Sequence, residues 1–83
     1  MIADPNPAEQ QMTMIKNMVD RLAQRLQQDG HDVDGWMQLM RSYVVLGQRG
    51  LAIAANQKAR LALSNDVDAL RRLDAAAKEL GVE

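Results

Sequence analysis

The segment DVDGWMQLMRSYVVLG, residues 32–47, contains the only Trp and the only Tyr of the 83-residue chain. Asp32 is a residue type that caps helix N-termini, and Gly47 is one that ends helices. Between them, Trp36 and Tyr43 are seven residues apart, so they share one face of an α-helix with the apolar residues that lie between them at helical spacing. The pattern predicts a helix whose aromatic face is buried.

The same pattern returns 34 residues further along the chain. Residues 66–81 repeat six of the sixteen positions: Asp66, Val67, Asp68, Leu73, Leu80 and Gly81 match Asp32, Val33, Asp34, Leu39, Leu46 and Gly47. A period of 34 residues is that of the tetratricopeptide (TPR) helix-turn-helix repeat, whose first helix has the pattern W-x2-L-G-x2-Y. Trp36, Leu39, Met40 and Tyr43 resemble that signature, with Met40 in place of the usual small residue.

A longer helix is predicted before this repeat, over residues 7–29. Asn6 fits an N-cap, Pro7 fits the first helical position, and Glu9 completes a capping box. Gly30 is placed to end the helix. One helical stripe of apolar residues runs along it: Met12, Ile15, Val19, Leu22 and Leu26.

Two further helices are predicted after the aromatic one, over residues 49–63 and 67–80. The first has small residues on one side, which allow a neighbouring helix to approach closely; they are Ala52, Ala55, Ala59 and Ala62. The second begins after Asp66 and ends at Gly81. No segment alternates with the period of two that a strand requires.

The predicted fold class is therefore all-α, a TPR-like helical hairpin array of about four antiparallel helices. By resemblance to TPR proteins it is a fragment of a right-handed superhelix. We expect a flexible arm at residues 1–6 and a single domain at residues 7–83, made of a preceding helix (7–29), one full repeat (33–64) and a closing helix (67–80).

Composition argues against several classes of function. The net charge is −1 with acidic and basic residues interleaved, so nucleic-acid binding is disfavoured. There is no Cys and only one His, His31, so we expect no metal site and no cofactor. The Ser residues have no His at helical spacing to act as a base, so no enzymatic activity is expected. No apolar run approaches the roughly 18 residues of a membrane span.

The helix side opposite Trp36 is the candidate binding surface. It carries Asp34, Met37, Gln38, Arg41, Val44 and Val45, and Arg71 and Arg72 occupy the corresponding side of residues 67–80. Apolar side chains with an arginine nearby suit an amphipathic or extended peptide. In the alternative interpretation, Val44 and Val45 pack on residues 67–80 or on a second subunit, and Arg71 and Arg72 are solvated.

A homodimer is also expected, because the first and last helices of a short array lack a neighbour on one side. Met12, Ile15 or Met18 from residues 7–29 would be buried in it, and Met12 and Met18 are interpreted as core or dimer contacts.

Three segments together resemble a narrower family. MVDRLAQRL (18–26), DGWMQLMRSYVVLG (34–47) and LRRLDAAAKELG (70–81) are similar to the periplasmic TPR region of the c-type cytochrome biogenesis factor CycH, also called CcmI. The resemblance implies a periplasmic module that holds apocytochrome c, largely through its C-terminal helix, for the haem-ligation complex. It also implies membrane attachment through an anchor that is not in this fragment. The alternative is a structural oligomerisation or adaptor module with no peptide groove.

Overall fold

The computed structural model describes residues 7–83, with side chains from residue 10 onward. Its elements are four helices, α1 (Pro7–Gln28), α2 (Val33–Val45), α3 (Arg49–Ala62) and α4 (Val67–Leu80), and these residues contain no strand. Three of these helices begin and end within one residue of the ranges predicted for them, and α2 lies between the predicted cap Asp32 and the predicted stop Gly47, so the predicted all-α helical hairpin array is confirmed. Residues 1–6 and the predicted Asn6 cap lie outside the described residues.

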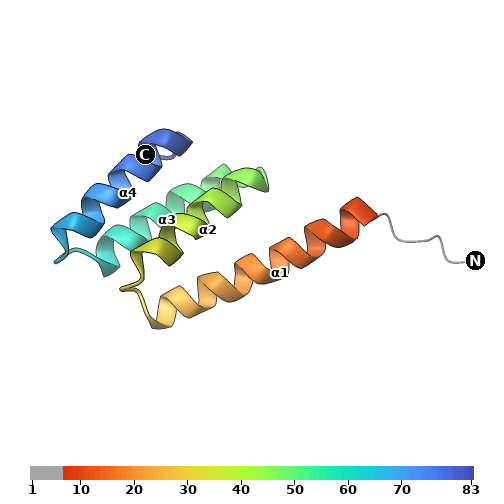
Figure 1. Cartoon of the computed structure of the whole chain (residues 1–83), viewed down its shortest axis with the longest axis horizontal. Helices are drawn as coiled ribbons and strands as arrows, with labels where there is room; N and C mark the ends of the chain where they lie inside the picture. The colour runs from red at the N-terminus through yellow and green to blue at the C-terminus, as the bar shows by residue number, and fades with distance from the viewer. Residues whose placement is uncertain (1–6) are drawn as a thin grey trace, which may run out of the picture.

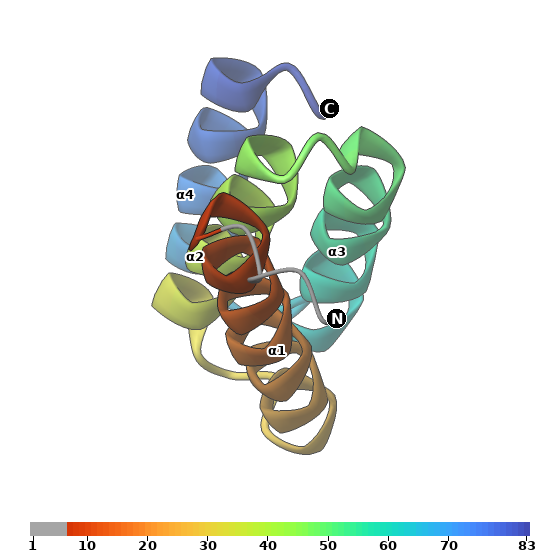
Figure 2. The same ribbon diagram turned by 90° about the vertical axis from the view of Figure 1, so that its right-hand side faces the viewer.

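Consecutive helices run antiparallel and α2 lies at the centre (Figure 1). The backbone of α2 packs against all three other helices, α3 packs on α2 and α4, and α1, among the described helices, packs on α2 alone. Figure 2 shows the projecting end of α1 toward the viewer, with α3 and α4 on its two sides. None of these helices is long and apolar enough to cross a membrane.

Aspartate caps fix where α2 and α4 begin. Asp32 accepts a hydrogen bond from the backbone N–H of Gly35 at 2.9 Å, and Asp66 accepts one from Ala69 at 3.0 Å. These bonds satisfy backbone donors that the first helical turn leaves free. The bond from Gly35, reinforced by the Arg25 guanidinium and opposed by partial burial, holds the pKa of Asp32 below its ordinary value of 3.8.

Left-handed glycines end α2 and α4 in the same way. Gly47 has φ of 75° and Gly81 has φ of 70°, a region that favours glycine. Gly30, predicted to end α1 by the same device, does not have a positive φ. Its small size matters for another reason, since a Cβ at Gly30 would lie 2.7 Å from the Cβ of Ala62. Gly30 therefore lets the α1–α2 connection approach α3.

The core lies along α2, as the aromatic pattern predicts. Trp36 is only 3% exposed, and its indole N–H donates to the carbonyl oxygen of Gly30 at 3.0 Å. Burying a ring of this size contributes about 3 kcal/mol by area. The facing side of α3 is built of buried alanines, which let the two helices approach closely; they are Ala52, Ala55 and Ala59.

One polar side chain lies inside this core. Asn56 on α3 is buried, and its side-chain oxygen has no hydrogen-bond partner among the described residues. An unpaired buried polar group costs stability. Asn56 is therefore a weak point of the hairpin between α2 and α3.

Candidate functional site

The centre of the candidate surface is the side of α2 that points away from Trp36. Val45 is 77% exposed there, and Gln38 and Arg41 beside it are also exposed. The three share a side because they are spaced three, four and seven residues apart. Arg41 forms no ion pair with any residue of the described chain, so its guanidinium is available to an anion.

Met37 and Val44 lie between this surface and the core. Both are half-buried and pack against the buried core cluster. Packing within the domain therefore takes up part of their surface, in line with the alternative interpretation for Val44. Val45 differs, because its exposure shows that it does not pack on α4 within one chain.

Asp34 and Arg72 form an ion pair with each other, joining the first turn of α2 to α4. Both side chains are largely exposed, so the pair is worth at most about 1 kcal/mol. Each already has a partner, so neither is a free anchor for a ligand. Arg71 is exposed and has no ion-pair partner in the described part of the chain, but it points about 100° away from Arg72 around α4, on the side of Val67.

The first helix adds two residues that sequence reasoning did not place at this site. Two observations show how α1 lines up with α2. Leu26 lies so close to Gly35 that a Cβ added there would be 2.9 Å from it, and Arg25 forms an ion pair with Asp32 at 3.2 Å. The two helices are antiparallel and rise by the same distance per residue. Because Leu26 lies opposite Gly35, Met18, which is eight residues before Leu26, is at the level of Tyr43, which is eight residues after Gly35.

Met18 also shares a side with Arg25, because seven residues complete almost two helical turns. From this register we infer that Met18 lies on the side of α1 nearer Val45, with Met14 one turn further out. Met14 and Met18 are each 65% exposed. They are not in the monomer core, contrary to one of the interpretations of Met18.

We call this surface the binding face: Met14, Met18, Gln38, Arg41 and Val45. Its apolar part comes from α1 and α2, and its unpaired guanidinium is that of Arg41 on α2. The sequence does hold a signal for the methionines, since Met14, Met18 and Arg25 form a second stripe on residues 7–29. That stripe runs beside the more obvious one through Ile15 and Val19.

His31 lies in the connection between α1 and α2. Within residues 7–83 no group of three or more His, Cys, Asp or Glu side chains is arranged to hold a metal ion. The chemistry that the binding face offers is therefore non-covalent: apolar contact beside charge-assisted hydrogen bonds to an anionic group.

Comparison with known proteins gives two similar relatives. The chain is 44% identical over 70 residues to the cytochrome c-type biogenesis protein CycH of Bradyrhizobium diazoefficiens, a match that covers 84% of this chain and 19% of that protein. It is 42% identical over 76 residues to CycH of Rhizobium meliloti, covering 92% of this chain and 20% of that protein.

The chain is homologous to part of CycH. It spans about a fifth of the length of these CycH proteins. No protein-family model matches it, and no solved structure matches it. The similarity to CycH runs over most of the chain, so it includes the helices that form the binding face.

Proposed function

We propose that this chain is a peptide-binding module of cytochrome c maturation, which holds the C-terminal helix of apocytochrome c while other components attach haem. The similarity to proteins named for cytochrome c-type biogenesis supports the pathway. The observation that carries the binding role is the exposed Val45 on the same side of α2 as the unpaired Arg41. The resemblance of Trp36, Leu39 and Tyr43 to the TPR signature also supports the binding of a peptide.

On this proposal the role is non-enzymatic and takes place in the periplasm. The partners are the apocytochrome c polypeptide and components of the haem-ligation complex. The parent protein would be attached to the membrane by an anchor outside this fragment. Apolar side chains of the peptide would contact Met14, Met18 and Val45, and a carboxylate would pair with Arg41.

Titration calorimetry with a synthetic peptide of a bacterial apocytochrome c C-terminal helix, without haem, tests the proposal. We expect saturable binding at about micromolar dissociation constants or weaker, since ordering a free helix offsets part of the contact energy. Val45→Glu should abolish binding without changing the melting temperature, because the side chain is exposed and a carboxylate there repels an acidic ligand.

Val67→Glu is the matched control, because Val67 is also an exposed valine, 62% accessible, but lies at the start of α4 outside the binding face. It should bind like the wild type. Absence of heat with the wild-type chain would reject peptide binding. Equal binding by Val45→Glu would show that the peptide uses another surface.

A further inference from the structure

The N-terminal half of α1 projects beyond the rest of the molecule (Figure 1). Helix α1 has 22 residues and α2 has 13, so at 1.5 Å per residue α1 is about 13 Å longer. Val19 and Leu26 on its apolar stripe are buried against α2, but Met12 on the same stripe is 42% exposed. The stripe therefore continues past the end of the surface that covers it.

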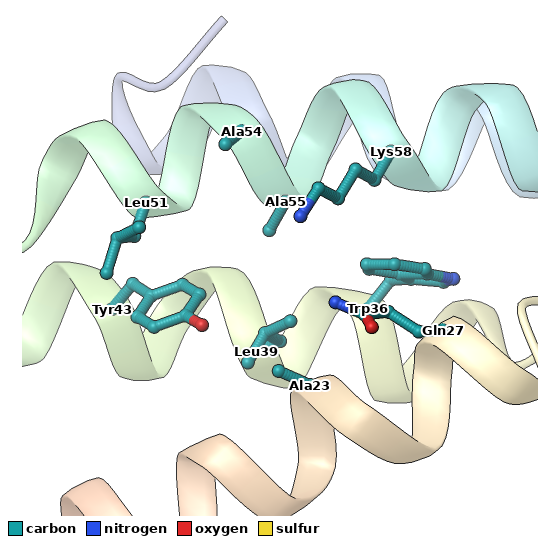
Figure 3. Close-up of a pocket in the computed structure, with 9 residues that line it drawn as sticks. All are labelled: Ala23, Gln27, Trp36, Leu39, Tyr43, Leu51, Ala54, Ala55 and Lys58. Carbon is teal, nitrogen blue, oxygen red and sulfur yellow. The ribbon is translucent and has the colours of Figure 1, made fainter.

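A second uncovered apolar surface lies between α1 and α3, and we call it the furrow. Trp36 and Tyr43 of α2 form its floor, with Ala23 of α1 on one wall and Leu51 of α3 on the other (Figure 3). This cleft of about 70 Å³ continues past Lys58 into an open hollow of about 500 Å³. The hollow is edged by Leu61, which is 79% exposed.

The furrow is the empty corner of a four-helix arrangement. Helices α1 and α3 both run antiparallel to α2, so they run in the same direction, and their backbones do not come into contact. A helix placed between them would complete an antiparallel bundle if it ran in the opposite direction to both. A twofold axis across α1 supplies such a helix, because it makes the α1 of a second copy antiparallel to the first.

Charges on the furrow side of α1 are self-complementary in that arrangement. Ala23 and Gln27 line the cleft, and Lys16 and Asp20 continue the same side at helical spacing. Desolvation, followed by the negative charge of Asp20, raises the pKa of Tyr43 on the furrow floor. Neither Lys16 nor Asp20 has an ion-pair partner in the described chain.

A twofold axis near residue 18 would bring Lys16 of each copy opposite the partner's Asp20, forming two ion pairs. The same operation turns the apolar stripe of the projecting half toward α3 of the other copy. The partner's Met12 and Ile15 would then face Leu51 and Leu61 across the furrow.

We propose that two copies of this chain associate about a twofold axis near the middle of α1, each laying the N-terminal half of α1 in the furrow of the other. The proposal does not rest on peptide binding, because the two surfaces lie on different sides of α1. Met18 on the binding face and Ala23 on the furrow are five residues apart, which is about 140° around the helix.

Charge reversal in separate chains tests the interface. Light scattering and sedimentation at about 100 micromolar protein, a concentration suited to ordinary interface affinities, should give twice the 9.2 kDa chain mass for the wild type. The Lys16→Glu chain and the Asp20→Lys chain should each be monomeric. In a dimer of either chain, both of the Lys16–Asp20 ion pairs would be replaced by two groups of the same charge. An equal mixture of the two chains should recover the dimer, since it restores two opposite-charge pairs.

Three further variants locate the contact. Leu61→Glu should weaken the dimer at least tenfold, whereas Val67→Glu and Met18→Glu should leave it intact. A thermal melt of each variant checks that a variant that no longer dimerises is still folded. A monomeric wild type, a mixture that stays monomeric, or a dimer that breaks with Met18→Glu but not with Leu61→Glu would each overturn the proposal.

Discussion

At the scale of a single residue, Trp36 has two roles in the structure, which account for an aromatic residue at this position. Its ring is buried between the helices, while its indole N–H reaches the carbonyl oxygen of Gly30. The side chain therefore joins α2 to the α1–α2 connection as well as filling the core. Tyr43, seven residues later, is half-buried and stands on the furrow floor, so the two aromatic residues have different roles.

Asn56 leads to a stability prediction at the same scale. Asn56→Leu should raise the free energy of unfolding by about 1 kcal/mol or more, because leucine has a similar shape and leaves no unpaired polar atom in the core. Urea denaturation followed by circular dichroism measures the change. Gln57→Leu, at an exposed position next to it, is the control and should change stability little. A less stable Asn56→Leu chain would show that the amide makes a bond the prediction neglects.

At the scale of the element, the capping carboxylates define the helix starts and give an acid dependence. The pKa of Asp32 is lowered in the folded chain, so its contribution is present above the unfolded value of 3.8 and is lost as the pH falls below about 4. Asp32→Ala should cost about 1 kcal/mol near neutral pH. Asp32→Asn should keep most of the stability that the N-cap contributes, and its stability should fall less than that of the wild type as the pH is lowered.

Thermal melts between about pH 3 and pH 7 compare these variants across the range in which an ordinary carboxyl group titrates. Asp68→Ala is the control, because Asp68 lies in the first turn of α4 but does not cap it. It should lose less stability than Asp32→Ala. A wild-type acid profile in the Asp32→Asn chain would mean that another carboxylate controls the transition.

At the scale of the whole molecule, the binding face and the furrow lie on different sides of the α1–α2 pair. We therefore expect the two proposed activities to be separable. Val45→Glu should lose peptide binding and still dimerise, while Lys16→Glu should be monomeric and still bind peptide. Calorimetry measures peptide binding, and sedimentation measures dimerisation, for each of the two variants. Loss of both activities in either variant would mean that one surface serves both.

The helices and the burial of Trp36 could be predicted from local sequence patterns. Caps such as Asp32 and Asp66 and left-handed glycines such as Gly47 act through hydrogen bonds and backbone angles within a few residues, so local sequence is sufficient to place them. Periodicity likewise predicted that Trp36 is buried. Spacing also predicted that Gln38, Arg41 and Val45 share the side of α2 away from Trp36, and these three side chains are exposed.

Which neighbour each side of a helix meets could not be predicted in this way, because it depends on how the helices pack together. The tertiary structure paired Asp34 with Arg72, turned Val44 partly inward and left Val45 exposed. It also left Met18 exposed and left a furrow between α1 and α3. The physical reason is that helical periodicity fixes directions around one axis, whereas contacts depend on the register and rotation of two helices, which are set by the packing of the whole core.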